Sequence, residues 1–309
     1  MKKAWKYILA LLLAVSCTKV EVRTVNDTFR ISRRNNPESA ETDELHLYAF
    51  RKDDGCLESV SNGYGDSISA SLISGRKYIL YLLGNFTPEG ETGSETEFLK
   101  RRVRLEEQDV RRPALFSPPL QYGGKGDNSS FHLKRYLSRI SIGEIRCEWL
   151  EDISVEVTML AIVNAAGSIP LSGIPDDNDI CFNLSGVDTN LPPGVKEKLV
   201  WEGSRDIGSN NDMGISLYCF PSSCDTDCYG APWTPRRTRL AIRLSIGGEI
   251  NWYPLNLPRM ECNTNYMIDG IVIKGPGSLE PDMEIDRQSI SFDIMIKPWS
   301  GETIDMDFQ

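Results

Sequence analysis

Cysteine is the residue type in this sequence with the clearest capacity for chemistry. Eight are present, and Cys219, Cys224, Cys228 and Cys262 form the closest cluster. Structural zinc sites usually draw thiolates from tight two-residue spacings, whereas four and three residues separate the first three members of this cluster. A disulfide within 219–228 stays open as an alternative, because exported proteins retain such bonds. The spacing therefore predicts no metal site, and most other cysteines are expected to be small buried hydrophobic residues.

The remaining catalytic residue types do not form a recognisable pattern. His46 and His132 each lie in a strand-like stretch without a local partner, which favours structural roles. The Gly-Gly-Lys-Gly run at 123–126 lacks the spacing of a phosphate-binding loop and indicates a turn. Carboxylates are plentiful, but nothing singles out a pair of the kind that glycosidases use. We therefore predict a protein that is not an enzyme, with no catalytic residues and no cofactor.

The first seventeen residues indicate an export signal that ends at a cysteine. Three lysines precede an apolar run of eight residues at 8–15, which is far shorter than the roughly 20 residues of a membrane-spanning helix. Small residues then lead into Cys17, the position at which bacterial lipoproteins are cleaved and acylated. Several acyl chains there would give stable attachment to the outer membrane. We predict a signal peptide at 1–16 and a lipid on Cys17; an ordinary signal peptide that happens to contain a cysteine is the alternative.

Charge limits the partners of the mature chain. Removing the three lysines of the first sixteen residues takes the formal net charge from −10 to −13. A chain this acidic is poorly suited to bind nucleic-acid phosphates through a basic face. Its 40% hydrophobic content is typical of a packed core. The composition therefore predicts a folded, acidic protein that does not bind nucleic acid.

The hydrophobic pattern predicts an all-β protein. Short runs of alternating or β-branched residues are divided by Gly, Pro, Asn, Asp and Ser, as in β-sandwiches. The predicted strands are 45–50, 68–73, 77–83, 103–105, 137–145, 155–163, 215–220, 240–246, 252–257, 266–273 and 290–296. One short helix is expected within 95–108.

Two β-sandwich domains in tandem fit this length. The proline-rich 113–119 and the glycine-rich 123–128 mark the boundary. We predict an N-terminal domain at 17–128 and a C-terminal domain at 129–309, both of ordinary size.

Six groups of residues follow one another in an order that carries a family resemblance. They are 43–50 with 53–55, 78–85, 133–142, 217–221 with 238–242, 252–258 with 265–268, and 294–299. Together they resemble the fimbrillin family of Bacteroidales type V pili, which includes stalk, tip and anchor subunits. The resemblance covers nearly the whole mature chain. One departure is the cysteine-rich segment that follows Pro221.

The resemblance implies two transthyretin-like domains and a polymer built by donor-strand exchange. In family stalk subunits a trypsin-like protease cuts the lipidated precursor after a basic residue, which releases the lipid and the first strand. The terminal strand of another subunit then fills the open groove. The implied partners are other fimbrial subunits, the outer membrane through Cys17, and a receptor on a host or bacterial surface. The implied location is the cell surface, within a fimbrium. Whether the chain is a stalk, tip or anchor subunit stays open.

The last residues meet the requirements of a donor strand. A donor needs one apolar face with a period of two residues, and Ile304, Met306 and Phe308 alternate with acidic residues after a Ser-Gly turn. The alternative is that 304–308 is an ordinary last strand of the second domain.

The first residues of the mature chain contain the candidate for the released strand. Val20 with Val22, and Phe29 with Ile31, are apolar pairs in opposite phase, so we expect a turn at Asn26-Asp27 between them. Arg33 and Arg34 follow at the place of the family's maturation cut. A solvated basic turn is the alternative interpretation, because anchor subunits share this region and keep their lipid.

A surface glycan-binding lipoprotein is the rival function from another class. It would need exposed aromatic side chains that form a platform. Trp149, Trp201, Trp233 and Trp252 are available, but each lies in a strand or beside prolines, where core positions are more common. A secreted hydrolase with a cleft of converging carboxylates is a weaker rival.

Overall fold

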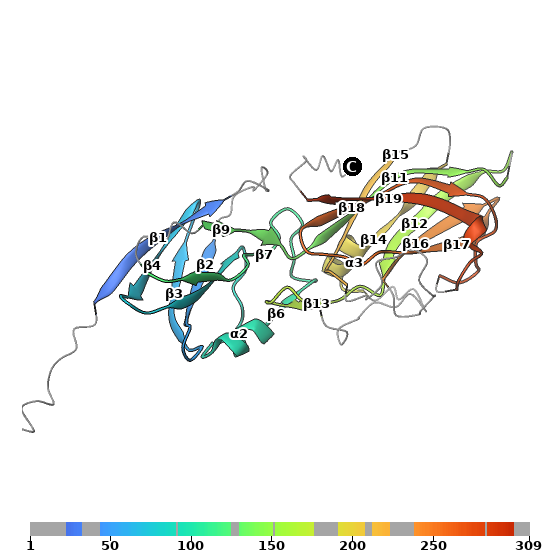
Figure 1. Cartoon of the computed structure of the whole chain (residues 1–309). Coiled ribbons are helices and arrows are strands. Elements are labelled where there is room, and N and C mark those ends of the chain that lie inside the picture. Colours follow the sequence, from blue (N-terminus) through green and yellow to red (C-terminus); the bar gives the residue numbers. More distant parts are fainter. Residues whose placement is uncertain are drawn as a thin grey trace, which may run out of the picture.

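The computed structural model describes residues 23–32, 44–90, 92–124, 130–150, 152–175, 191–207, 212–222, 238–281 and 283–299. The described chain is dominated by strands, which confirms the predicted all-β class. Figure 1 shows two groups of strands at opposite ends of an elongated molecule, with β6 and β13 between them. Among the described residues, no helix has both the length and the apolar character that crossing a bilayer requires.

The N-terminal group contains two sheets. The first has the order β4-β1-β9, with β1 at Thr24–Ser32, β4 at Ser67–Ile73 and β9 at Ser130–His132. The second has the order β10-β7-β5-β2-β3, and β8 also pairs with β5. Its strands are β2 (Leu45–Arg51), β3 (Leu57–Gly63), β5 (Tyr78–Gly84), β7 (Leu115–Phe116), β8 (Leu120–Tyr122) and β10 (Lys134–Arg135).

The C-terminal group contains two sheets of four strands. One has the order β15-β11-β18-β19, with β11 at Ser138–Cys147, β15 at Asp212–Cys219, β18 at Thr264–Ile273 and β19 at Ile290–Pro298. The other has the order β14-β12-β16-β17, with β12 at Val155–Val163, β14 at Val200–Asp206, β16 at Arg239–Ile246 and β17 at Glu249–Asn256. The hairpin between β16 and β17 turns on Gly247 and Gly248, whose positive φ angles of 58° and 90° suit a two-residue loop.

Alternation along the strands explains which faces are buried. In β4 the buried residues are Ile68, Ala70 and Leu72, and the residues between them are exposed. β2 is different, because six of its seven residues are buried. Leu45, Leu47 and Ala49 pack toward β1 and β4, whereas Tyr48 and Phe50 join the main core. A strand with cores on both faces loses its polar alternation and becomes a continuous apolar run.

Short elements join the two groups. Helix α2 (Glu95–Lys100) is capped by Ser94, whose hydroxyl accepts a hydrogen bond from the Glu97 amide, and it buries Phe98. β6 (Arg102–Arg104) follows directly, so the helix occupies only the first part of the range 95–108 in which it was expected. β6 pairs with β13 (Ser168–Pro170) of the C-terminal half. The other helices within the described residues are α3 (Pro193–Leu199) and the 3-10 helix η3 (Arg287–Ser289).

The junction between the halves is tightly packed. One apolar cluster runs from Tyr48 and Phe98 of the N-terminal half to Trp299. The Tyr136 hydroxyl donates to the Leu171 carbonyl at 3.0 Å. A β-carbon on Gly194 of α3 would lie 2.7 Å from the Glu106 carbonyl oxygen, so only glycine permits this approach. The two halves therefore share a core and do not meet through a bare linker.

Candidate assembly site

Strand β1 lies between two other strands of its sheet. It pairs antiparallel with β4 over seven residues, from Thr24 opposite Ile73 to Arg30 opposite Ser67. On its other side it pairs in parallel with β9 over three residues, beginning at Arg30 opposite Ser130. The main chain of β1 therefore pairs with β4 over residues 24–30 and with β9 at residues 30–32. Figure 1 shows β1 at the end of the molecule that is farther from the C-terminal sheets.

The inner face of β1 completes a separate apolar core. Phe29 and Ile31 are 3% and 7% exposed, and they pack with residues of β2, β4, β5 and β9. The Phe29 ring lies 5.4 Å from the Tyr122 ring and 5.7 Å from the Phe131 ring, measured between centroids. Removing β1 would leave this core open on one side.

The expected turn at Asn26-Asp27 is wrong, because β1 is continuous from residue 24 to residue 32. Pairing with β4 supplies the backbone partners that a turn would otherwise provide, and Asn26 accepts a hydrogen bond from the Ser71 hydroxyl at 2.5 Å. Val25, Asp27, Phe29 and Ile31 consequently share one face. Val20 and Val22 lie outside the described residues.

Asp27 is a polar residue on the inner face of β1. It lies opposite Ala70 of β4, and its carboxylate accepts a hydrogen bond from the Tyr122 hydroxyl. The bond satisfies the carboxylate, but the position contributes no apolar contact. β1 is therefore a less apolar strand than its slot could accommodate.

Other predicted site residues fall outside the described part of the chain. These are Cys17, Arg33, Arg34, Ile304, Met306 and Phe308. The described residues nonetheless border them closely. β1 ends at Ser32, directly before Arg33. β19 ends at Pro298, and Trp299 is the last described residue before Ser300.

The sequence predicted the strand at 68–73 that is β4, but it gave no prediction of β9, the other partner of β1. β9 is only three residues long, and Phe131 at its centre is 1% exposed against Ile31 and Phe29. The only signal for it in the sequence was a single aromatic residue between a glycine-rich run and His132. The pairing across about 100 residues of chain could not be read from a local pattern.

Phe29 provides a direct test of the β1 core. Replacing Phe29 with alanine in the full chain should lower the free energy of unfolding by about 3–5 kcal/mol, because a large cavity would form in a closed core. Thr28→Ala is the matched control. The Thr28 hydroxyl contacts the Ser69 hydroxyl on the exposed face at 2.8 Å, so the free energy of unfolding should fall by about 1 kcal/mol or less. Urea unfolding of both variants measures the difference, and equal losses would contradict the assigned faces of β1.

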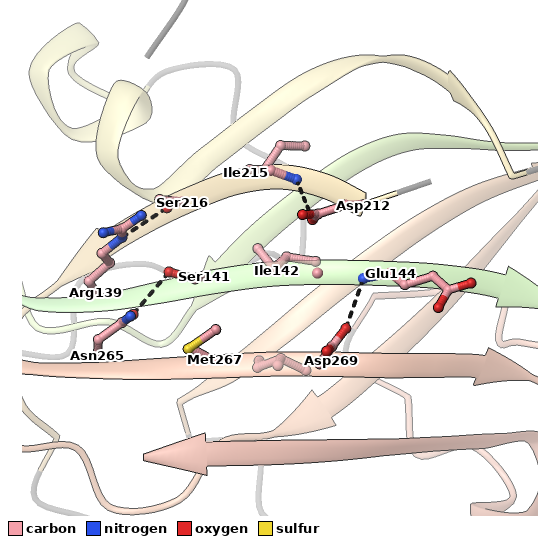
Figure 2. Close-up of a pocket in the computed structure, with 13 residues that line it drawn as sticks. Arg139, Ser141, Ile142, Glu144, Asp212, Ile215, Ser216, Asn265, Met267 and Asp269 are labelled. Atoms are coloured by element: carbon pink, nitrogen blue, oxygen red, sulfur yellow. Dashed lines mark hydrogen bonds between the residues drawn. The ribbon is translucent and has the colours of Figure 1, made fainter. Parts of the chain in front are cut away.

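A polar hollow of about 500 Å³ lies on the outer face of β11, β15 and β18. Figure 2 shows Arg139 at one end, with its Nε donating to Ser216 at 3.0 Å, and Asp269 at the other, where it accepts from the Glu144 amide at 3.1 Å. The Ser141 hydroxyl donates to Asn265 at 2.9 Å between them. Gly143 leaves room for the Asp269 carboxylate, since a β-carbon at residue 143 would collide with it. The lining contains no histidine or cysteine that could form a nucleophile and base pair.

The described cysteines do not form a metal site. Cys56, Cys147, Cys219 and Cys262 are free thiols, and no three potential ligand side chains come together within the described ranges. Cys219 is therefore not disulfide-bonded, while Cys224 and Cys228 lie outside those ranges. Burial raises the pKa of the Cys262 thiol to about 12 and raises that of Cys219 further. Both are expected to stay protonated and unreactive at neutral pH.

The tryptophans in the described part do not form an aromatic platform. Trp252 is 5% exposed, whereas Trp149 is 36% exposed in the loop after β11. Trp201 lies on β14, at the other edge of the sheet that contains Trp252, and the Arg205 guanidinium lies 5.9 Å from its ring centroid. Trp233 lies outside the described ranges.

Comparison with solved structures identifies the fold. The chain is similar to a fimbrilin from Porphyromonas gingivalis, with a TM-score of 0.59 and 15% identity over 88% of this chain and 97% of that chain. It is also similar to a protein of Bacteroides eggerthii assigned to cell adhesion, with a TM-score of 0.65 and 14% identity over 90% and 96% of the two chains. A Parabacteroides distasonis protein with the same assignment has a TM-score of 0.60 and 12% identity over 89% and 98%.

These likenesses are likenesses of fold. They support the all-β fold that the sequence predicted, at identities too low to carry function with them. No sequence profile of a known family and no curated protein sequence matches this chain.

Proposed function

We propose that this chain is a structural subunit of a cell-surface fimbria that is exported as a lipoprotein and assembled by donor-strand exchange. The observation that carries the proposal is β1, a strand held between β4 and β9 that buries Phe29 and Ile31. Its C-terminal end is followed at once by the dibasic pair Arg33-Arg34. The shared fold with a fimbrilin and with proteins assigned to cell adhesion supports the same role.

The maturation step is hydrolysis of the peptide bond after Arg33 or Arg34. After the cut, β1 is held only by the hydrogen bonds and apolar contacts of its slot. When β1 leaves, the slot is lined by Ile68, Ala70 and Leu72 of β4 and by Phe131 of β9. Such an opening exposes apolar side chains and two unpaired strand edges, which makes it a strong acceptor for an extended strand.

The C-terminal segment of another subunit is the proposed occupant of the slot. Ile304, Met306 and Phe308 repeat at two-residue spacing, as do the inner residues of β1. An apolar side chain at the position of Asp27 would add contacts that the carboxylate does not make. The tail presents three apolar residues at consecutive alternate positions, whereas Asp27 interrupts the apolar face of β1.

The proposal assigns a structural role and no reaction to this chain. Its partners are other fimbrial subunits, the outer membrane through a lipid on Cys17, and a receptor on a host or bacterial surface. In this role the β-sheets transmit load along the fimbria, and the shared core at the junction of the two halves resists bending between them.

The state of the N-terminus tests the export part of the proposal. Protein extracted from the cell surface should begin either at an acylated Cys17 or just after Arg33 or Arg34, as measured by intact mass. Cys17→Ala should eliminate the acylated form, because alanine offers no thiol for the lipid. Cys56→Ala is the matched control and should leave acylation unchanged. An acylated form that persists in Cys17→Ala would contradict the assignment.

A further inference from the structure

The polar hollow on the outer face of β11, β15 and β18 has a volume typical of small-ligand sites. Its volume of about 500 Å³ lies within the usual range of roughly 300–1,000 Å³ for such sites. Two shifts in strand register shape it. The pairing of β11 with β15 shifts between Ile142 and Glu144, and that of β18 with β19 shifts after Asp269. Such irregularities re-aim side chains and are common beside functional sites.

One end of the hollow presents a guanidinium group with free donors. The Arg139 side chain is held by Ser216, to whose hydroxyl its Nε donates at 3.0 Å (Figure 2). Among the described residues this is the only hydrogen bond of the guanidinium, and no carboxylate lies within ion-pair distance of it. The N–H groups on its two terminal nitrogens are therefore available to a ligand.

Asn265 adds a buried donor beside Arg139. It lies opposite Arg139 in the parallel pairing of β11 with β18, and it is only 8% exposed. Its side-chain oxygen accepts from the Ser141 hydroxyl at 2.9 Å, whereas its NH2 group has no hydrogen-bond partner within the described ranges. A polar group buried to this degree normally has a partner. Because Asn265 lines the hollow, that partner must enter from the hollow.

The opposite end of the hollow presents carboxylates. Asp269 accepts from the amides of Glu144 and Gly270 at 3.1 and 2.9 Å, and Asp212 accepts from the Gly214 amide at 3.0 Å. These main-chain bonds hold both aspartates in place. No lysine or arginine of the described chain forms an ion pair with Asp212, Glu144 or Asp269. Their remaining oxygens can accept hydrogen bonds from a ligand, and such charge-assisted bonds are strong.

The two ends are far enough apart to bind different parts of one ligand. Asn265 and Asp269 are four residues apart on β18, which corresponds to roughly 13 Å along the strand. Met267 lies between them and is partly exposed, so it offers an apolar contact in the middle of the hollow. The hollow therefore has a donor end, an apolar middle and an acceptor end.

We propose that this hollow binds a saccharide with a single carboxylate group, such as a uronic acid linked to a neutral sugar. The carboxylate accepts two parallel hydrogen bonds from Arg139 and a further one from Asn265. Hydroxyl groups of the neutral sugar donate to Asp212 and Asp269. The C–H face of the ring packs on Met267, whose flexible side chain adapts to irregular apolar surfaces.

The charges of the hollow select against other ligands. Arg139 contributes one positive charge and the three carboxylates contribute three negative charges, so the formal charge of the lining is −2. The acceptor end therefore repels a ligand with several negative charges, such as a nucleotide or a sulfated polymer. A neutral saccharide would leave the Arg139 guanidinium without an anion.

An extended peptide fits the middle of the hollow poorly. It would bring main-chain N–H and C=O groups at every residue, and buried groups of this kind need partners. The hydroxyl groups available between the two ends are those of Ser141 and Ser216, which already bond to Asn265 and Arg139. A sugar ring has apolar C–H groups at this position and leaves fewer polar groups unpaired.

Saccharide binding is independent of assembly, but its role in adhesion rests on the proposed function. A polymer repeats the site in every subunit, so many weak contacts with a glycan-covered surface would combine into firm attachment. The inference thus names the chemistry of the receptor that the proposed function requires.

Titration calorimetry of the full-length chain tests the site. The probe is a disaccharide that ends in glucuronic acid, and its control is the same disaccharide ending in glucose. The acidic probe should bind at least about tenfold more tightly, because it alone pairs with the guanidinium. Arg139→Gln should remove this preference and leave the affinity for the glucose probe unchanged. Asp269→Asn should weaken the binding of both probes, since both carry the sugar hydroxyls.

Arg146→Gln is the matched control variant. Arg146 lies on the same strand, β11, and pairs with Glu148 at 3.5 Å outside the hollow, so its replacement should leave both affinities as in wild type. Equal affinity of wild type for the two probes would overturn the proposal, as would a preference for the acidic probe that persists in Arg139→Gln. No detectable binding of either saccharide would overturn it as well.

Two further measurements separate this inference from its rivals. A peptide with one Glu and one Lys four residues apart is titrated in the same way, and tighter binding of this peptide would overturn the proposal in favour of a protein partner. Polymerisation after proteolysis is measured on the same samples. Saccharide binding without polymerisation would contradict the proposed function alone, whereas polymerisation without saccharide binding would contradict this inference alone.

Discussion

Replacing both Arg33 and Arg34 with alanine is expected to abolish polymer formation and leave a folded monomer. A trypsin-like protease needs a basic residue before the bond that it cuts, so the double variant should keep β1 attached. β1 then continues to fill the slot between β4 and β9, with Phe29 and Ile31 buried. A donor strand could enter only by displacing a strand that the chain holds nearby at high effective concentration.

The experiment compares wild type and the double variant after incubation with trypsin. SDS-resistant ladders measure polymer, and intact mass measures the N-terminus. Arg30→Ala is the matched control, because this exposed arginine lies within β1 itself and its loss leaves the dibasic pair intact. The control should polymerise normally. A normal ladder from the double variant with β1 still attached would refute the exchange mechanism.

Charges on the apolar face of the tail should have a similarly large effect. Met306→Asp with Phe308→Asp is expected to reduce assembly at least roughly a hundredfold, since burying uncompensated carboxylates costs about 3 kcal/mol or more. The free energy of unfolding of the variant monomer, measured in urea, should equal that of wild type to within about 1 kcal/mol, because the cores described for the two halves are formed by other residues. Removing residues 300–309 altogether should have the same result.

The matched control places changes on the opposite face of the same segment. Asp305→Asn with Asp307→Asn leaves the apolar side chains unaltered and should still assemble. Mixing the Met306→Asp, Phe308→Asp variant with wild type adds a second readout. This variant can accept a tail but cannot donate one, so it should shorten wild-type polymers in proportion to its amount. If the Met306→Asp, Phe308→Asp variant alone formed polymers of the same length and in the same yield as wild type, the tail would not be the donor.

The regular strands could be predicted from local pattern. The alternation at 155–163 corresponds to β12 from its first to its last residue, and 45–50 and 266–273 lie within β2 and β18. Burial on one face of a sheet imposes a two-residue period on the sequence, so the pattern itself carries the information. The all-β class followed from these segments alone.

Segments with weak patterns were missed. β14 is largely exposed and rich in polar residues, and it is a strand because β12 supplies its hydrogen bonds. α3 begins with Pro193, which suits the first position of a helix, but Gly194 follows and the helix is only seven residues long. It buries Val195 and Leu199 against the junction. The conformations of β14 and α3 depend mainly on pairing and packing with distant residues.

For the candidate assembly site, sequence alone determined the residue types: a dibasic pair, an alternating apolar tail and a cysteine after an export-type segment. Only the tertiary structure decided that β1 is one unbroken strand, that it lies between β4 and β9, and that Arg139 and Asn265 line one hollow. The physical reason is the range of the interactions. The chemistry of each side chain follows from its residue type. Hydrogen bonds between strands of one sheet, in contrast, join segments about 100 residues apart and exist only once the chain has folded.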